Sequence, residues 1–150
     1  MMEFNFAYLF IWFAFFPICI LVHELGHAFF ITLWGWKVTN IQVGWGDTLI
    51  KIGKLSVNKM FFIGGLCSYE RPDHVSKIKK AFVHLGGVFF NALFIGVLYW
   101  LSFFFKTEYI GYLNFMNSLL ILICLIPCND PRGYPSDGKQ FLRLLRKETA

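Results

Sequence analysis

The stretch that decides the fold lies near the N-terminus, at residues 6–27, and reads FAYLFIWFAFFPICILVHELGH. Residues 6–22 contain no charged side chain, whereas residues 23–27 contain two histidines and one glutamate. About 20 helical apolar residues cross the ~30 Å hydrocarbon core of a bilayer. Ionisable groups at membrane depth are costly and usually serve a function. The stretch therefore predicts a membrane-spanning helix that carries a functional group in its second half.

The composition of the whole chain supports a membrane protein. Hydrophobic residues make up 57% of the 150 residues, aromatic residues 20% and charged residues only 15%. The chain contains 19 phenylalanines, more than the core of a small globular domain could bury. A bilayer removes this difficulty, because side chains that face lipid are also apolar. We therefore expect an integral multi-pass protein of a bacterial cell membrane, with the lipid bilayer around it.

The net charge and the spacing of the cysteines argue against a nucleic-acid-binding protein and against a disulfide-stabilised protein. The net charge of +5 is low for a nucleic-acid binder, and no Arg/Lys stripe is interleaved with exposed aromatic residues, so no nucleic-acid partner is expected. The four cysteines have no CxxC spacing, and a disulfide framework is not expected. These cysteines are Cys19, Cys67, Cys124 and Cys128.

Three stretches are long and apolar enough to cross the membrane, at about residues 6–34, 81–105 and 109–128. We interpret the first as a retained span, because no basic residue precedes it and no small-residue cleavage site follows it. The short link between the other two predicts an antiparallel helical hairpin. The predicted fold is a mainly α membrane protein with three transmembrane helices, in a single domain over residues 1–150.

A short membrane-associated β-loop is predicted between the first and second spans, at about residues 37–65. Its segments TNIQVGW (39–45), TLIKIG (48–53) and NKMFFIGG (58–65) are rich in β-branched or aromatic residues and are separated by Gly and Gly-Asp turn signals. They predict two or three short antiparallel strands. The alternative is a solvated loop with a few buried anchors.

The C-terminal part and the positive charges predict the orientation of the chain. Residues 129–139, NDPRGYPSDGK, read as a Pro/Gly-rich loop, and residues from about 138 to 148 as a basic amphipathic helix on the membrane surface. Residues 1–5 contain no Lys or Arg, whereas residues 35–80 and the C-terminal segment carry most of them. Because positive charge is retained in the cytoplasm, we expect the N-terminus outside, and HELGH and the C-terminus on the cytoplasmic side.

HELGH has the spacing of a metal site. His23 and His27 lie on one face of a helix and can bind one ion. Zinc accepts neutral imidazoles, and catalytic zinc sites commonly have three protein ligands and a water. Glu24 is not needed as a ligand, and the motif gives it proton transfer from the attacking water to the leaving amine. HExxH also arises by chance in soluble helices, but three ionisable groups at the end of an apolar span favour one Zn²⁺ per chain.

A third ligand is expected beyond the third span. The further histidine of the longer HExxHxxGxxH pattern is absent, because residues 28–36 read AFFITLWGW. Asp130 and Asp137 both follow the third span, on the same side of the membrane as HELGH. We favour Asp137, which precedes Gly138 in a loop able to fold back to the helix ends, and keep Asp130 as the alternative.

Together, these motifs resemble those of the site-2 protease family of intramembrane zinc metalloproteases. The matching pieces follow the family order over nearly the whole chain, and they are HELGH (23–27), FFIGG (61–65), GGVFFN (86–91) and PSDGKQ (135–140). Two features depart from the family pattern. Cys124 stands where the family often has an asparagine, and the loop from Pro127 to Asp137 is longer than usual.

The resemblance implies a set of site residues. It implies His23, His27 and Asp137 as zinc ligands and Glu24 as the general base. It also implies Asn91 as a catalytic polar group that lines the site. For Asn91, an interhelical hydrogen bond is the alternative.

The resemblance further implies an intramembrane zinc metalloprotease that hydrolyses a peptide bond in or near a transmembrane segment of a membrane-protein substrate. One alternative is a catalytically inactive relative that binds membrane proteins. Another is a haem or metal carrier with His27 and His84 as axial ligands. The presence of Glu24 favours the enzyme, because binding a metal does not require that carboxylate.

Overall fold

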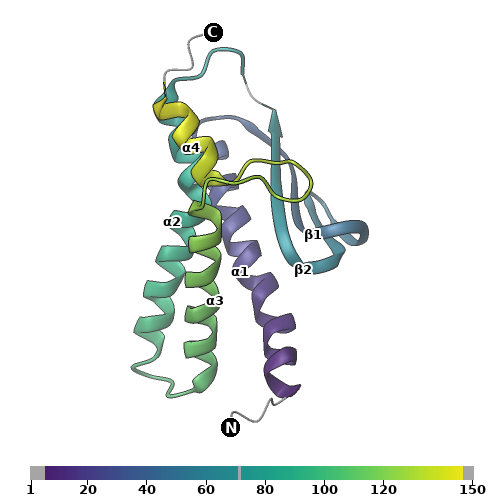
Figure 1. Cartoon of the computed structure of the whole chain (residues 1–150), viewed down its shortest axis with the longest axis vertical. Helices are drawn as coiled ribbons and strands as arrows, with labels where there is room; N and C mark the ends of the chain where they lie inside the picture. The colour runs from purple at the N-terminus through teal and green to yellow at the C-terminus, as the bar shows by residue number, and fades with distance from the viewer. Residues whose placement is uncertain (1–5, 71, 147–150) are drawn as a thin grey trace.

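The computed structural model describes residues 6–70 and 72–146 of the chain. The order of its elements is α1 (Phe6–Leu33), β1 (Lys37–Ile52), β2 (Leu55–Glu70), α2 (Lys77–Leu101), α3 (Glu108–Leu125) and α4 (Asp137–Leu145). The three long helices run side by side, the β1–β2 hairpin lies along α1, and α4 lies beside the upper part of α2 (Figure 1).

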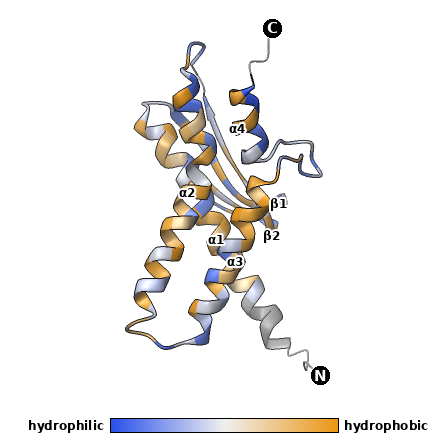
Figure 2. Ribbon diagram, turned by 60° about the vertical axis from the view of Figure 1, so that its left-hand side comes forward, coloured by the Kyte–Doolittle hydropathy of each residue, from blue (hydrophilic) through white to orange (hydrophobic). Residues whose placement is uncertain are grey.

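Three of the helices are long and apolar enough to cross a membrane, as the sequence predicts. These segments are Trp12–Leu33, Lys77–Leu101 and Glu108–Leu125. The outer faces of α2 and α3 are largely apolar (Figure 2). Large apolar side chains exposed over such an area are unusual in a soluble monomer and suit a lipid environment.

The helix ends differ from the predicted ones, for local reasons. α2 begins at Lys77 rather than near residue 81, because the Ser76 side chain caps it by accepting a hydrogen bond from the Lys79 backbone N–H. α2 ends at Leu101 and α3 at Leu125, each a few residues before the predicted end. The residue before a proline is disfavoured in a helix, and Ile126 before Pro127 is extended.

The β-loop consists of two long strands rather than two or three short ones. β1 and β2 pair antiparallel with repeated shifts of register, and Ile41 pairs with both Cys67 and Leu55. Gly44 and Gly46, each with φ of 85°, bend β1 so that it curls back on itself. β2 also continues to Glu70, beyond the predicted end of the loop at residue 65. The hairpin is therefore a curled sheet in which residues 41–43 have neighbours on both sides.

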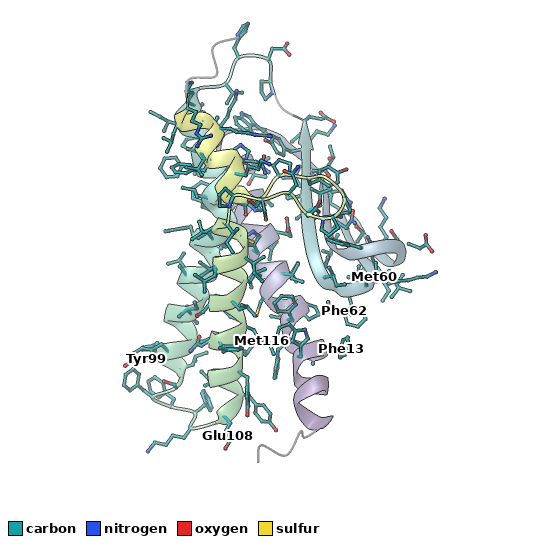
Figure 3. All side chains as sticks on the ribbon, in the orientation of Figure 1. Phe13, Met60, Phe62, Tyr99, Glu108 and Met116 are labelled. Carbon is teal, nitrogen blue, oxygen red and sulfur yellow. The ribbon has the colours of Figure 1, made fainter. Side chains whose placement is uncertain are left out.

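α1 is the central element of the packing. Its Cys19 and Ile20 are buried with Met116 and Leu120 of α3, and nearer its C-terminal end Ile31 is buried in a second cluster that includes Val83 of α2. Lower on α1, the Phe13 ring contacts the Phe62 ring of β2 edge to face, with centroids 4.8 Å apart (Figure 3). The hairpin is thus held along the side of the spanning helix.

A pair of glycines lets α1 and α2 approach closely. A Cβ atom added to Gly86 would lie 2.6 Å from the Gly26 carbonyl oxygen, and a Cβ added to Gly26 would meet the Gly86 carbonyl. Small residues at such crossings are typical of helix pairs in membranes. Gly26 is the fourth residue of HELGH, so the crossing brings α2 against the motif.

The C-terminal helix α4 covers Asp137–Leu145, close to the predicted range of 138–148, of which residues 147 and 148 lie outside the described part of the chain. Ser136 caps it by accepting from the Lys139 backbone N–H at 3.2 Å. It carries both apolar and polar residues (Figure 2), and its apolar residues Phe141, Leu142, Leu144 and Leu145 are spaced as in an amphipathic helix.

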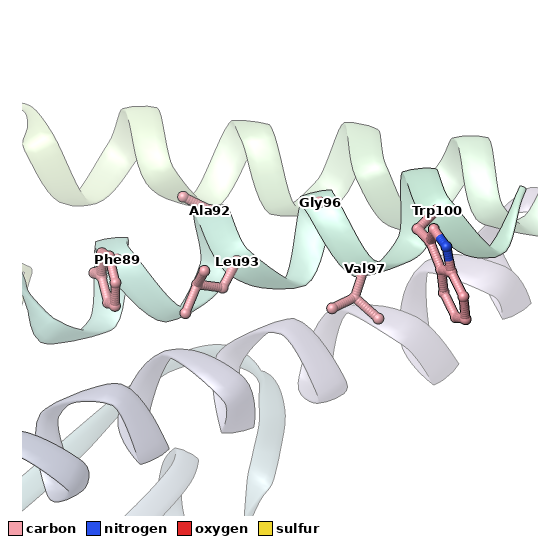
Figure 4. A pocket seen from close by; sticks show the side chains of 6 residues that line it. All are labelled: Phe89, Ala92, Leu93, Gly96, Val97 and Trp100. Atoms are coloured by element: carbon pink, nitrogen blue, oxygen red, sulfur yellow. The ribbon is translucent and has the colours of Figure 1, made fainter.

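A shallow hollow lies on one side of α2, and six residues of this helix line it (Figure 4). These residues are Phe89, Ala92, Leu93, Gly96, Val97 and Trp100. None of them is titratable or offers a metal ligand, so the chemistry of the chain has to be sought elsewhere.

Candidate metal centre

α1 carries the three ionisable residues of HELGH into the interior. His23 and Glu24 each expose 5% of their surface, and His27 exposes 9%. The spacing of four residues places both imidazoles on one face of the helix, with ring centroids 4.8 Å apart. Buried ionisable groups at this density need partners.

Asp137 supplies that partner from the start of α4. Its Oδ2 lies 2.9 Å from His23 Nε2 and 3.5 Å from His27 Nε2. Asp130, the alternative, is engaged elsewhere, because both its carboxylate oxygens accept hydrogen bonds from Arg132 or the neighbouring backbone. The structure thus brings Asp137, and not Asp130, to the two histidines.

The long loop before Asp137 forms a small hairpin that returns to its starting point. The Ser136 backbone N–H donates to the Cys128 carbonyl at 2.9 Å, and the Ser136 hydroxyl donates to the Ile126 carbonyl at 2.6 Å. Asn129 and Pro135 form an isolated β-bridge between these ends. The residues that make this loop longer than usual therefore form a hairpin whose two ends meet, and Asp137 remains close to the end of α3.

The tip of this loop is attached to the β1–β2 hairpin. The Arg132 guanidinium stacks over the Trp45 ring at 4.4 Å and pairs with Asp130 at 2.8 Å. Burial works against the charged form of Asp130, but hydrogen bonds and charge attraction from Arg132 outweigh it and lower the pKa of this carboxyl. Asp130 therefore orders the tip of this loop, whereas the Ser136 contacts hold the end next to Asp137.

The orientation of His27 is fixed by a backbone carbonyl of α2. Its Nδ1–H donates to the Val83 carbonyl oxygen, and the two atoms are 2.6 Å apart. A proton on Nδ1 leaves Nε2 as the atom that can bind a metal, and metal-binding histidines are usually held in this way. The sequence gives no signal for this contact, because any residue at position 83 has a carbonyl.

Three glycines make room for the site. A Cβ added to Gly87 would meet the His23 imidazole, and one added to Gly65 would meet the Glu24 carboxylate. A Cβ added to Gly138 would meet the Leu125 carbonyl, so the Asp-Gly pair sits directly on the end of α3. The glycines of FFIGG, GGVFFN and PSDGKQ therefore share one role, which is to let the backbone approach the site.

Gly87→Ala is expected to weaken zinc binding by about 10–100-fold, the range typical for loss of a group that supports a ligand. The added methyl group would push the His23 ring away from Asp137. Gly96→Ala, in the same helix, is the matched control, because nothing lies within 4 Å of a Cβ there. Titration of both purified variants with a zinc indicator measures the difference, and equal affinities would contradict the role of Gly87.

Asn91 lies among the helices, outside the cavity that contains the histidines. Its side chain is fully buried, and its Nδ2 donates to Asn117 Oδ1 at 2.9 Å and to the Cys19 carbonyl at 3.3 Å. The bond between Asn91 and Asn117 joins two helices, which is the alternative role predicted for Asn91 from the sequence. The structure does not bring Asn91 to Glu24, and its catalytic role stays a prediction.

Comparing Asn91→Ala with Asn117→Ala separates the two roles. If the pair only joins α2 to α3, each variant should lose about 0.6 kcal/mol of stability, and up to ~1.7 kcal/mol, with a similar effect on hydrolysis. We expect a similar effect on hydrolysis in both variants, with the larger loss of stability in Asn91→Ala, because Asn91 donates to the Cys19 carbonyl as well as to Asn117. A much larger loss of hydrolysis in Asn91→Ala alone, beyond what its loss of stability explains, would instead assign Asn91 to the substrate.

A cavity of about 950 Å³ opens beside the side chains of His23, Glu24, His27 and Asp137. Its upper wall contains His23, Glu24, His27, His84 and Asp137, and β2 contributes residues 62–69. Its lower wall is apolar and follows α1 and α3, with side chains that include Trp12, Phe16, Ile20, Leu120 and Ile123. The cavity thus has an apolar part along α1 and α3 and a polar end at the ionisable residues.

The separations of Asp137 Oδ2 from the two imidazole nitrogens suit a zinc ion. Tetrahedral bonds of ~2.0–2.1 Å place nitrogen and oxygen ligands about 3.3 Å apart, and the observed separations from Asp137 Oδ2 of 2.9 and 3.5 Å lie on either side of this value. Burial disfavours the charged form of Asp137, but attraction to His27 and the hydrogen bond with His23 outweigh it and lower the pKa of its carboxyl. An anionic carboxylate beside two imidazoles is a donor set suited to Zn²⁺.

The fold joins three helices suited to a membrane to a largely buried cluster of two histidines, a glutamate and an aspartate, an arrangement typical of a metal-binding membrane protein. The chain matches the model of peptidase family M50 over residues 11–149, and it belongs to this family. Membership of this family supports the assignment of the chain as a membrane metalloprotease of the site-2 protease type. Members of the family are generally zinc metalloproteases. The resemblance found in the sequence is therefore confirmed.

A relative supports the membrane assignment. The chain is 26% identical over 139 residues to the uncharacterized membrane protein YwmF of Bacillus subtilis (strain 168). The match covers 87% of this chain and 83% of that protein.

Proposed function

We propose that this chain hydrolyses a peptide bond within or beside a membrane-spanning segment of a protein substrate. The observation that carries the proposal is the approach of Asp137 Oδ2 to His23 Nε2 and His27 Nε2, at 2.9 and 3.5 Å, next to the buried Glu24. Membership of peptidase family M50 supports the same reaction class.

In this proposal each residue has a separate task. His23, His27 and Asp137 hold a zinc ion, which when bound polarises the substrate carbonyl and makes water more acidic. Glu24 takes the proton of the attacking water and then delivers it to the leaving amine. Gly65 makes room for the Glu24 carboxylate, because a Cβ at this position would meet it.

The cavity favours a substrate that arrives through the membrane. Its apolar wall along α1 and α3 suits the side chains of a membrane segment, and its polar end lies at Glu24. Residues 62–69 of β2 form one side of the cavity, so an extended peptide can lie along this strand and pair with it by edge addition. A helical peptide bond is shielded by its own backbone, and the substrate must therefore unwind locally before cleavage.

The test is a comparison of membrane proteomes from cells that express the wild-type chain or its Glu24→Gln form. Single-span membrane proteins should accumulate at full length in the Glu24→Gln cells, and their fragments should be absent. Identical proteomes under conditions in which both chains are present at equal level would count against proteolysis. They would favour an inactive relative that binds membrane proteins.

The haem-carrier alternative makes a different prediction. It needs His27 and His84 as axial ligands, so the purified protein would show a Soret band. The proposed protease would carry zinc and no haem. Two contacts of His27 favour zinc. The Nδ1–H bond to the Val83 carbonyl leaves Nε2 as the atom that can bind a metal, and Asp137 Oδ2 lies 3.5 Å from this atom.

A further inference from the structure

One side chain beside the metal centre has no task in the proposed reaction. Cys124, in the last turn of α3, lies in a group with His23 and Asp137 whose possible ligand atoms are all within 4.8 Å of one another. It also lines the cavity at the site. The thiol therefore faces the same space as His23 and Asp137, two of the three proposed zinc ligands, whereas His27 lies outside this group.

Cysteine sulfur is a strong zinc ligand, and the number of protein ligands decides what a zinc site can do. Sites with three protein ligands keep an open position for water and are catalytic, whereas sites with four are closed and structural. His23, His27 and Asp137 make three. A thiolate from Cys124 would be the fourth, and it would occupy the position that the attacking water needs.

We propose that the Cys124 thiolate binds the metal ion as a fourth protein ligand in the substrate-free protein and keeps the centre closed. The inference rests on the proposed function, because it concerns the same ion. On binding, the sulfur–metal bond forms and the thiol proton leaves to water through the cavity. When substrate enters, the bond breaks, the sulfur takes up a proton again, and the position becomes free.

The geometry allows this exchange with small movements. Tetrahedral bonds of ~2.3 Å to sulfur and ~2.0 Å to nitrogen place these two atoms about 3.6 Å apart. A ligand atom within 4.8 Å therefore reaches this position after a displacement on the order of 1 Å, which a turn of the cysteine side chain provides. Because α3 also carries Leu120 and Ile123 into the apolar wall, a substrate in the cavity would contact the helix that holds the thiol.

The other cysteines of the chain serve as internal controls. Cys128 lines the cavity but is exposed, and it lies in the loop after α3 rather than in the group with His23. Cys67 lines the cavity from β2 and likewise lies outside that group. All four thiols of the chain are free, and Cys19 is buried in the core, away from this group.

The test uses the purified full chain in detergent, stripped of metal and loaded with Co²⁺ in place of zinc. Wild-type protein with one bound cobalt should show a thiolate-to-cobalt charge-transfer band in the near ultraviolet. Cys124→Ser should lose this band and keep the visible bands of tetrahedral cobalt, whereas Cys128→Ser should keep both. A fully loaded wild-type protein without the charge-transfer band would overturn the proposal, as would a band that survives in Cys124→Ser.

A second measurement needs no variant. Wild-type protein is treated with a small alkylating reagent with and without bound zinc, and each cysteine is quantified by mass spectrometry. Zinc should slow modification of Cys124 at least about tenfold and leave Cys128 unaffected, and equal modification of Cys124 in both states would contradict ligation. Failure to bind any cobalt or zinc would instead overturn the proposed function, so the two failures are distinguishable.

Discussion

Replacing Glu24 by glutamine should abolish hydrolysis while leaving the metal in place. General acid–base catalysis by one side chain typically contributes about 10²–10⁴-fold to a rate, and Glu24 is assigned both proton transfers. Glutamine has nearly the same shape, so it should fit against Gly65 where the carboxylate lies now. It cannot accept a proton at neutral pH, and the loss should appear in the rate rather than in metal content.

The measurement is cleavage of a membrane-spanning substrate in reconstituted vesicles, with zinc determined in the same preparations. Glu108→Gln is the matched control, because this glutamate lies in the first turn of α3, far along the chain from the site, and is exposed. It should cleave at the wild-type rate. A Glu24→Gln protein with full activity would exclude Glu24 as the base, and one that had lost its zinc would make Glu24 a ligand instead.

The second large effect is expected from the two aspartates beyond α3. Asp137→Asn should weaken zinc binding more than the ~10–100-fold that loss of a supporting group costs, because a direct anionic ligand is lost. Asp130→Asn should bind zinc nearly as the wild type does, since it breaks only the contacts that order the Arg132 loop. Competition with a chelator of known affinity measures both variants.

This pair of variants decides between the two ligands that the sequence left open. Both substitutions remove one negative charge from the same segment, so a general electrostatic effect would weaken zinc binding equally. A selective loss in Asp137→Asn agrees with the 2.9 and 3.5 Å separations from the imidazoles. A selective loss in Asp130→Asn would require the loop to rearrange when metal binds.

The helices and the histidine pair could be predicted because each depends on local sequence. Apolar runs of sufficient length predicted α1, α2 and α3, and the four-residue spacing in HELGH placed both imidazoles on one face. The ends of the helices were less accurate, since caps such as Ser76 act through one side chain. The β-loop was predicted as shorter strands, because the glycines at 44 and 46 read as turns and instead bend a continuous strand.

The approach of Asp137 to the histidines was predicted, but other contacts between distant segments were not. The loop from Pro127 to Asp137 returns to its start through Ser136, and no pattern in its sequence predicts that closure. The partner of His27 is a backbone carbonyl, which has no sequence signature. Asn91 was predicted from family resemblance to line the site, whereas its partner in the structure, Asn117, is on another helix. Cys124 appeared in the sequence only as a departure from the family pattern.

The central claim is that α1 and the start of α4 hold one metal ion between them. Its most direct test is the zinc content of the folded, purified chain, measured together with that of a His23→Ala/His27→Ala double variant. One zinc per wild-type chain and none in the folded double variant is the predicted result. Well-folded wild-type protein that takes up no zinc, or a double variant that retains it in full, would contradict the account.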